Sequence, residues 1–428
     1  MAAPRKNAWT RLYGWLLDGL YLPLRSVSPV CPASFRERLG LYTPEALRPL
    51  ASGDNLWLHA ASAGEVNAIL PLARAFKARH PGAHIVLTTS SATGKRLALE
   101  RQAADAVFLA PLDMTGPLRR AFRAFRPRLL LIAETEFWPA WLFRARRNQV
   151  PTLLVNGRIS DKSFPSYQKM RGLFGPALQC FDQCLVQTEG DRDKLAALGV
   201  LEGKVRVLGQ MKYDLAPPDP AKAAEWGRVL GIREGDAWVV LGSLREGEED
   251  LLFPQLPRLL AGHPGLRILV APRHVKNAAL YQKKLGQMGL TSRLRSEAGE
   301  GSPSPVVVLD TVGELSLAYS LARAAFVGGT LVPVGGHNVM EPALSGVPVL
   351  FGPHTGNVAE AAEALLSRGG GFRSGDPAQL AARMEGLLDG DVSREAGQKA
   401  RLAVESLRGA TQKILEAVEA YWPGGPAV

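Results

Sequence analysis

The chain has 428 residues, 46% of them hydrophobic, and its 51 basic and 40 acidic side chains give a formal net charge of +11. This length and apolar content are typical of a globular protein with two or three domains. The positive charge favours an anionic partner, which could be nucleic acid, an acidic membrane surface or a phosphorylated substrate. Because the sequence has no zinc-finger spacing and no basic run interleaved with aromatic residues, nucleic acid is not expected.

The N-terminal residues 9–24 are apolar, rich in Trp and Tyr, and interrupted by Asp18. The stretch is too short for a transmembrane helix and lacks the small-residue cleavage site of a signal peptide. Two interpretations remain open: a helix anchored at the interface of the cytoplasmic leaflet, or an amphipathic helix packed on the body of the protein. The anchor is favoured by the flanking basic residues Arg5, Lys6, Arg11 and Arg25.

Short β-branched or Leu-rich runs alternate with helical patterns, which predicts parallel sheets with helices on both faces. In the first half we expect strands at residues 56–60, 84–89, 106–112, 128–133, 151–156, 183–188 and 204–208. A proline cluster at residues 215–220 is incompatible with a helix or a central strand and predicts a linker. The pattern then restarts, with strands expected at residues 238–242, 267–271, 306–310, 325–328 and 347–352.

These elements predict an N-terminal segment (residues 1–35) and two Rossmann-like α/β domains, 36–215 and 216–428. The carboxyl ends of the two sheets are expected to face a central cleft. Residues 393–421 are expected to form one long helix that packs back on the first domain. The three cysteines, Cys31, Cys180 and Cys184, form no CxxC motif, so we expect free thiols in a reducing compartment and no metal site.

In the first domain, three charged residues follow apolar strands. Glu65, in Ser62-Ala63-Gly64-Glu65, is a candidate general base at the carboxyl end of the first strand. Its alternative role is to complement the positive start of the next helix. Glu134 directly follows a very apolar strand and should be partly buried, where a carboxylate needs a partner or a raised pKa. Lys212 lies near the expected hinge, where it could face a phosphate or be a solvated surface lysine.

In the second domain, glycine-rich segments at residues 328–329 and 335–336 would let a ligand approach the backbone. Glu341, just after them, could accept hydrogen bonds from ribose hydroxyls. Arg273 ends another strand and could bind a phosphate bidentately, although such an arginine is more often a surface ion-pair partner. Together these segments indicate a lobe that binds a nucleotide sugar. The chain has no GxGxxG after the first strand of either half and no GxxxxGK[ST], which disfavours dehydrogenases and P-loop enzymes.

Taken in chain order, these segments resemble those of the 3-deoxy-D-manno-octulosonic acid (Kdo) transferases of lipopolysaccharide assembly, from about residue 10 to near the C-terminus. The segments are Ser62-Ala63-Gly64-Glu65, Glu134-Thr135-Glu136-Phe137-Trp138-Pro139, Asn156-Gly157-Arg158-Ile159-Ser160, Gln210-Met211-Lys212-Tyr213-Asp214, Gly242-Ser243 through Gly247-Glu248-Glu249, Pro272-Arg273-His274, and Gly335-Gly336-His337-Asn338 with Glu341.

The resemblance implies a GT-B fold and an inverting, metal-independent and cofactor-independent transfer of Kdo from CMP-Kdo to a lipid A precursor (lipid IVA). The implied location is the cytoplasmic side of the cell inner membrane. By position, Glu65 corresponds to the proton acceptor, and Glu134 and Lys212 correspond to transition-state stabilisers. The implied CMP-binding positions are Pro272, Arg273, Val312, Gly313, Glu314, Asn338, Val339, Met340 and Glu341.

The sequence departs from the family pattern at Leu244 and Arg245, where Thr and His are usual, so contacts made by that hydroxyl and imidazole are in doubt. Two alternative functions remain. One is a GT-B enzyme that acts on a UDP-sugar, and the other is a non-catalytic, membrane-associated lipid-binding protein.

Overall fold

The computed structural model describes residues 7–26, 31–51, 53–232, 236–297 and 304–422, and these form two compact units. Unit 1 comprises Met1–Asp214 and Arg408–Val428, and unit 2 comprises Leu215–Leu407. The division falls at the start of the proline cluster. Parts of the expected N-terminal segment, residues 1–6 and 27–30, lie outside the described residues.

Unit 1 contains a seven-stranded sheet in the order β3-β2-β1-β4-β5-β6-β7, and every strand pair is parallel. The prediction of a parallel α/β sheet is therefore confirmed for this unit. The strands are β1 (Asn55–His59), β2 (His84–Thr89), β3 (Ala106–Leu109), β4 (Pro127–Ala133), β5 (Thr152–Gly157), β6 (Gln183–Val186) and β7 (Val205–Val207).

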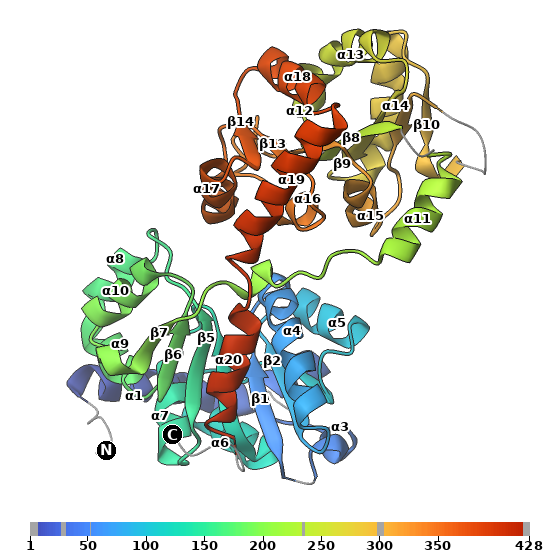
Figure 1. The fold of residues 1–428 in the computed structure, drawn as a ribbon. Helices are drawn as coiled ribbons and strands as arrows, with labels where there is room; N and C mark the ends of the chain where they lie inside the picture. Colours follow the sequence, from blue (N-terminus) through green and yellow to red (C-terminus); the bar gives the residue numbers. More distant parts are fainter. Residues whose placement is uncertain (1–6, 27–30, 52, 233–235, 298–303, 423–428) are drawn as a thin grey trace. The chain divides into compact units, whose positions relative to one another are not determined.

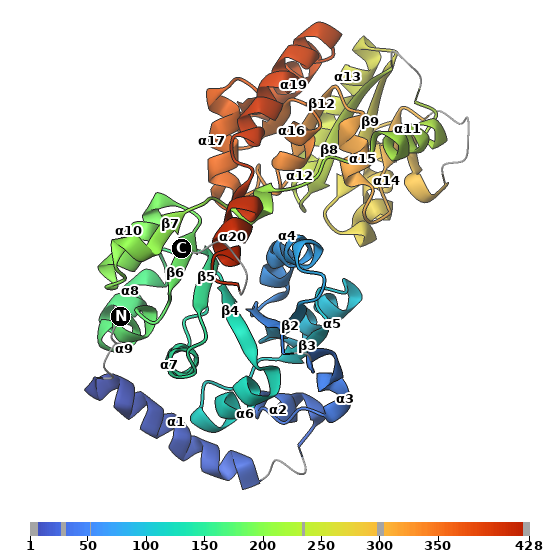
Figure 2. The same ribbon diagram turned by 60° about the horizontal axis from the view of Figure 1, so that its bottom comes forward.

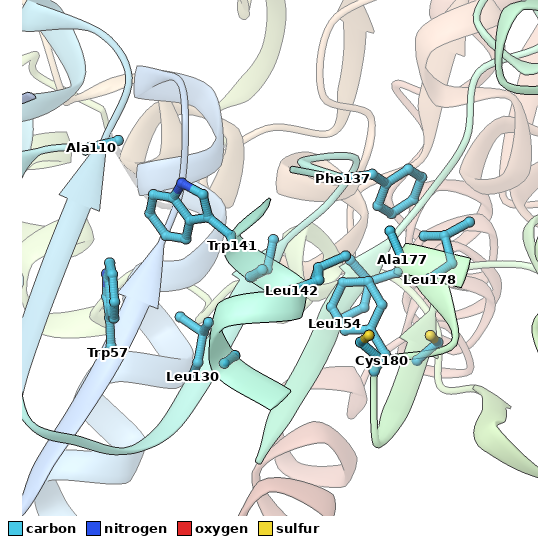
Figure 3. Close-up of a cluster of buried hydrophobic side chains, with 14 of the residues drawn as sticks. Trp57, Ala110, Leu130, Phe137, Trp141, Leu142, Leu154, Ala177, Leu178 and Cys180 are labelled. Carbon is cyan, nitrogen blue, oxygen red and sulfur yellow. The ribbon is translucent and has the colours of Figure 1, made fainter. Parts of the chain in front are cut away.

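Helices cover both faces of this sheet (Figure 1). They are α1 (Ala8–Ser26), α2 (Ala33–Arg38), α3 (Pro44–Leu47), α4 (Ala63–Arg79), α5 (Ala92–Glu100), α6 (Thr115–Phe125), α7 (Pro139–Arg147), α8 (Phe164–Lys169), α9 (Arg171–Leu178), α10 (Glu189–Ala197) and α20 (Ala410–Glu419). Alternate residues of β1 point to opposite faces: Trp57 joins one buried cluster, and Leu56 and Leu58 join another. Figure 3 shows the first cluster, in which Trp57 and Trp141 lie with ring centroids 4.8 Å apart.

Unit 2 contains a second seven-stranded parallel sheet, in the order β10-β11-β9-β8-β12-β13-β14. Its strands are β8 (Ala237–Leu244), β9 (Leu266–Pro272), β10 (Ser292–Leu294), β11 (Val306–Val308), β12 (Ala324–Val327), β13 (Val349–Phe351) and β14 (Gly371–Arg373). Its helices are α11 (Pro220–Val229), α12 (Glu248–Leu252), α13 (Leu256–Gly262), α14 (Ala278–Gln287), α15 (Leu315–Ser320), α16 (Met340–Leu344), α17 (Ala359–Ser367), α18 (Pro377–Gly386) and α19 (Gly390–Glu405).

Each sheet has one point at which the strand order reverses. In unit 1 it lies between β1 and β4, and in unit 2 it lies between β8 and β12. The connections that leave two such neighbouring strands run to opposite sides, which leaves the carboxyl ends of the strands open to a ligand. Glu65 follows β1 and Glu134 follows β4, so both lie at the reversal point of unit 1.

The prediction of one long C-terminal helix over residues 393–421 is wrong. The chain forms α19 and α20, separated at Gly409, which has a left-handed backbone conformation with φ of 96°. A residue with a side chain is disfavoured there, and glycine is not. In unit 1, α20 buries Ile414, Leu415 and Val418 in the same cluster as Phe76 of α4. The red helix α20 in Figure 1 therefore completes the core of unit 1.

Helix α1 packs against α6 and α9 on the outside of unit 1 (Figure 2). Among the residues that the structure describes, no helix is both long enough and apolar enough to cross a membrane.

Replacing Ile414 by Ala should lower the stability of unit 1 by about 2–5 kcal/mol, the usual cost of a cavity at a buried aliphatic position. Thermal and denaturant unfolding of the whole protein measure this loss. Lys413→Ala is the matched control, since Lys413 is exposed on the neighbouring position of α20 and should leave the midpoint nearly unchanged. Equal midpoints for the two variants would contradict a structural role for α20 in unit 1.

Candidate active site

Glu65 lies in the first turn of α4, immediately after the buried strand β1. Its carboxylate accepts hydrogen bonds from the Ala61 N–H at 2.8 Å and the Ser62 hydroxyl at 3.0 Å. Ser62 also accepts a hydrogen bond from the Glu65 N–H at 3.2 Å, so the two residues cap the start of α4 reciprocally. The carboxylate is therefore held in one place at the carboxyl end of β1.

Burial raises the pKa of Glu65, and the nearby charge of Glu136 adds to this effect. The hydrogen bonds from Ala61 and Ser62 lower the pKa but do not cancel the rise. Glu65 does cap the start of α4, but capping alone would stabilise the ionised carboxylate and lower its pKa. A fixed carboxylate with a raised pKa is a more effective proton acceptor than a solvated one.

Glu134 occupies a strained backbone position at the end of β4, with φ of 53°. Its carboxylate lies 3.1 Å from the guanidinium of Arg158, and Asn156, whose φ is 51°, donates a 3.5 Å hydrogen bond to it. Burial raises the pKa of Glu134, and Arg158 opposes this rise. Left-handed non-glycine residues are uncommon and gather at functional sites, so their occurrence side by side supports a functional role for this turn.

Lys212 lies in a short 3-10 helix, Met211–Tyr213, that follows β7. Asn156 connects this turn to Glu134, because its side-chain oxygen accepts a 3.2 Å hydrogen bond from the Met211 N–H. The charges of Lys212 and Glu65 both affect the pKa of Glu134, in opposite directions. The structure thus brings together the three charged residues that the sequence indicated in unit 1.

Two further residues belong to this cluster and were not singled out as site residues from the sequence. Glu136 accepts a 2.6 Å hydrogen bond from the Trp138 indole N–H, and its carboxylate lies 3.8 Å from Nε2 of the buried His59. Burial raises the pKa of Glu136, but His59 and Trp138 together lower it below its usual value. The only sequence signal was the repeated carboxylate in Glu134-Thr135-Glu136; nothing in the sequence connected His59 with it.

In unit 2, the glycine-rich turn after β12 is held by one buried carboxylate. Glu248 is fully buried and accepts hydrogen bonds from four backbone N–H groups, those of Arg245, Gly329, Thr330 and Leu331, at 2.7–2.9 Å. Any side chain at Gly328 would collide with Glu248 and the Ser243 carbonyl, at 2.7 and 2.5 Å. Glu248 therefore joins the carboxyl ends of β8 and β12 at the reversal point of the second sheet.

The segment that follows this turn carries Glu341. Asn338 donates a 3.2 Å hydrogen bond to the Glu341 carboxylate and accepts one from the Met340 N–H at 3.0 Å. Burial raises the pKa of Glu341, and the Asn338 amide opposes the rise. Val339 and Met340 are fully buried, so their side chains serve the core, and a ligand could meet only their backbone groups.

Arg245, one of the two departures from the family pattern, contacts the same segment. Its Nε donates a 3.0 Å hydrogen bond to Nε2 of His337. Its backbone N–H is one of the four that donate hydrogen bonds to Glu248. Burial lowers the pKa of His337 to about 4, and the charges of Arg245, Arg273 and His274 act in the same direction. His337 is consequently neutral at pH 7. The other departure, Leu244, is buried in the core.

The remaining predicted positions of unit 2 lie at the ends of neighbouring strands. Arg273 is exposed just after β9. Its charge lowers the pKa of His337, the residue before Asn338. The turn before α15 has an exposed Val312 and a left-handed Gly313, while Arg295 holds the Glu314 carboxylate at 3.0 Å. Glu314 is therefore already paired with a cation. Within the described residues, no cluster of three or more His, Cys, Asp or Glu side chains could hold a metal ion.

A family model described as 3-deoxy-D-manno-octulosonic-acid transferase matches residues 33–215. The chain is 33% identical over 404 residues to the 3-deoxy-D-manno-octulosonic acid transferase of Bordetella pertussis, covering 89% of this chain and 90% of that one. It is 30% identical over 413 residues to the transferase of the same name from Haemophilus influenzae, covering 94% of each. The chain belongs to the Kdo transferase family. It transfers Kdo in lipopolysaccharide biosynthesis.

The fold is that of the GT-B glycosyltransferases. A glycosyltransferase from Rickettsia africae superposes with a TM-score of 0.57 at 12% sequence identity, covering 86% of this chain and 99% of that one. At this identity the similarity shows the fold alone, and the two parallel sheets expected for a Kdo transferase are confirmed.

Glu248→Gln should destabilise unit 2 of this Kdo transferase, because the amide would turn an N–H donor toward backbone N–H groups that now share a carboxylate. Leaving one of them unsatisfied costs on the order of 1–3 kcal/mol, which thermal unfolding can measure. Glu246→Gln removes the same charge at an exposed position of the same turn and serves as the control. If both variants have the same Tm as the wild type, the stability of the glycine turn does not depend on Glu248.

Proposed function

We propose that this Kdo transferase uses CMP-Kdo as donor and a lipid A precursor, lipid IVA, as acceptor, with inversion at the anomeric carbon. The observation that carries the proposal is the cluster at the reversal point of unit 1. It combines a fixed, partly buried Glu65 of raised pKa with Glu134 and Lys212. Family membership supplies the transferred sugar, and this cluster supplies a base and charged groups for its transfer.

In the proposed reaction an acceptor hydroxyl attacks the anomeric carbon of Kdo, and the bond from that carbon to the CMP phosphate breaks. Glu65 accepts the hydroxyl proton as the new glycosidic bond forms, and the electrons of the broken bond leave with CMP. Glu134 and Lys212 then act on the charges that develop in the transition state. Arg158 and Asn156 are positioning residues, because they hold Glu134 in its left-handed turn.

Unit 2 is proposed to bind the CMP part of the donor. Arg273 would bind the phosphate, Glu341 the ribose hydroxyls, and the backbone at Pro272, Val312–Glu314 and Asn338–Met340 the rest of the nucleotide. A monophosphate leaving group carries less charge than a diphosphate, so guanidinium and backbone N–H groups can stabilise it without a metal ion. The glycine turn held by Glu248 keeps side chains away from the backbone at this edge.

The enzyme is further proposed to work at the cytoplasmic side of the inner membrane, with α1 on the membrane surface. One face of α1 is strongly apolar and exposed: Trp15 is 85% and Trp9 65% accessible to solvent. An aromatic, apolar face with nearby basic residues suits the headgroup layer of an anionic bilayer. At the membrane surface the enzyme would meet its lipid acceptor.

Two other functions are weighed against this one. A UDP-sugar enzyme with the same fold would bind UDP in preference to CMP, which calorimetry distinguishes directly. A non-catalytic lipid-binding protein would have no need of a strained turn that holds Glu134 beside Arg158. Titration of the intact enzyme with CMP and UDP therefore tests the donor assignment.

Glu65→Gln should lower kcat by roughly 10²–10⁴-fold, the usual contribution of a general base, while CMP binding stays near the wild-type level. Because burial raises the pKa of Glu65, the wild-type rate should rise with pH through a midpoint above the ordinary glutamate range of about 4.3. The variant should lose this limb of the pH profile. Near-normal turnover in Glu65→Gln would leave Glu65 only as a helix cap.

Arg273→Ala and Glu341→Ala should each weaken CMP binding by on the order of 1–3 kcal/mol, as for a lost charge-assisted hydrogen bond. Since CMP binds the native state, added CMP should raise the wild-type Tm more than that of either variant. Lys283→Ala removes an exposed charge from α14 in the same unit and is the control. An unaltered CMP-dependent shift in both site variants would place the nucleotide elsewhere.

A further inference from the structure

Helix α1 is fixed to unit 1 by polar contacts along one face. The Tyr13 hydroxyl donates a 2.6 Å hydrogen bond to Asp113, and Asp18 accepts one from the Thr115 N–H at 3.0 Å. Further along the helix, Arg120 of α6 donates a 2.6 Å hydrogen bond to the Tyr21 hydroxyl. The inner face of α1 is thus matched to this protein surface, and the position of the helix on unit 1 is specific.

The anchor for Tyr13 is a buried carboxylate that also caps α7. Asp113 accepts hydrogen bonds from the Ala140 and Trp141 N–H groups, at 3.2 and 2.9 Å. Burial raises the pKa of Asp113 to about 6, against the effect of these donors. Helix α1 and the start of α7 therefore share one hydrogen-bond acceptor, which sets the distance between the two helices.

The outer face of α1 has the opposite character. It exposes large apolar side chains at helical spacing: Trp9, Leu12, Trp15, Leu16 and Leu20. A contiguous apolar face of this size marks a surface that meets a partner or a membrane.

A cavity of about 500 Å³ lies beside α1, where α1 meets α6 and α7. Tyr13 and Gly14 of α1 form one wall, and Phe143, Arg144 and Arg147 of α7 form another. The space beside Gly14 is open, since a Cβ atom placed there would have no heavy atom within 4 Å. The volume is in the range of small-molecule sites and is large enough for a phosphorylated headgroup.

The charge of this cavity is strongly positive. Arg146 is paired with Asp182 at 3.4 Å, but neither Arg144 nor Arg147 forms an ion pair with any part of the chain that the structure describes. Burial lowers the pKa of Arg144, and the like charges of Arg147 and Arg119 lower it further, while the charge of Asp18 on α1 opposes part of this effect. Guanidinium groups that repel one another at the edge of a cavity are favourable sites for an anion, which would relieve the repulsion.

We propose that this cavity binds the anionic phosphate headgroup of a membrane lipid, held by Arg144 and Arg147 while the outer face of α1 rests in the same leaflet. Guanidinium groups bind phosphate through paired N–H donors, and the anion adds negative charge beside two arginines that repel each other. The inference rests on the proposed membrane location of α1. It adds a specific headgroup site on unit 1, whereas the CMP site is proposed for unit 2.

The alternative is that these arginines only complement the negative end of α7, in whose last turn they lie. That role requires no cavity and no phosphate. The two explanations differ in whether vesicle binding depends on headgroup chemistry and on free space at Gly14.

Co-sedimentation of the intact protein with vesicles tests the proposal. Phosphatidylcholine vesicles are given equal negative charge with either phosphatidic acid or oleate, and the wild type should prefer the phosphate-bearing vesicles. Arg144→Gln/Arg147→Gln should lose this preference and bind phosphatidic acid vesicles about ten-fold more weakly or worse. Arg74→Gln/Arg101→Gln removes the same charge from exposed positions, on α4 and directly after α5, and should keep the preference.

A steric variant separates the cavity from net charge. Gly14→Phe fills the cavity without changing charge and should lose the phosphate preference, whereas Gly19→Phe, at an exposed position of the same helix, should keep it. Circular dichroism and Tm identify any variant that fails to fold. If Gly14→Phe fails to fold, the result for Arg144→Gln/Arg147→Gln decides whether the headgroup site exists. Equal losses in the two arginine pairs, or an unchanged preference in Arg144→Gln/Arg147→Gln, would overturn the headgroup site. A wild type that binds neither vesicle would instead refute the membrane location, while Kdo transfer to detergent-dispersed acceptor would be unaffected.

Discussion

Both units depend on the same constraint of parallel sheets. Where the strand order reverses, between β1 and β4 and between β8 and β12, the connections leave on opposite sides and the strand ends stay uncovered. In unit 1 this exposes the segments that carry Glu65 and Glu134, and in unit 2 it exposes the turns at Arg245 and Gly329. Glu65 and Glu134 lie at this point of the first sheet, whereas Lys212 follows the edge strand β7 and Arg273 follows β9.

Buried polar groups fix these open strand ends. Glu248 accepts hydrogen bonds from four backbone N–H groups and so joins two turns of unit 2. Asn156 joins the turn of Glu134 to the turn of Lys212. Asp214, next to Lys212, accepts hydrogen bonds from the Gly409 and Thr411 N–H groups at the start of α20. The C-terminal helix therefore also fixes the turn that carries Lys212.

The alternation of strands and helices, the linker and the Glu65, Glu134 and Lys212 positions could be predicted because each depends on local pattern or short motifs. The edge strands β10 and β14 could not, since Ser292–Leu294 and Gly371–Arg373 each contain an arginine and lack the continuous apolar run that marks most of the other strands. The break at Gly409 was missed because an isolated glycine within a helical pattern does not always end a helix. The contact of His59 with Glu136 and the role of Glu248 depend on side chains brought together across the sheet, which no spacing along the chain encodes.

At Leu244 and Arg245, the two departures from the family pattern, the side chains have different surroundings. Leu244 replaces a polar side chain and joins the core, while Arg245 donates to His337 and helps to keep that imidazole neutral. The backbone N–H of Arg245 still binds Glu248, so the turn keeps its anchor whatever side chain it carries.

The central proposal is that the enzyme transfers Kdo from CMP-Kdo to a lipid A precursor. Incubating the purified enzyme with CMP-Kdo and tetraacylated lipid A precursor, and measuring product masses together with released CMP, tests it most directly. The account predicts a lipid product heavier by one or more whole Kdo residues, with one CMP released for each, and no transfer from a UDP-sugar. Release of CMP without a heavier lipid, or transfer from the UDP-sugar, would contradict it.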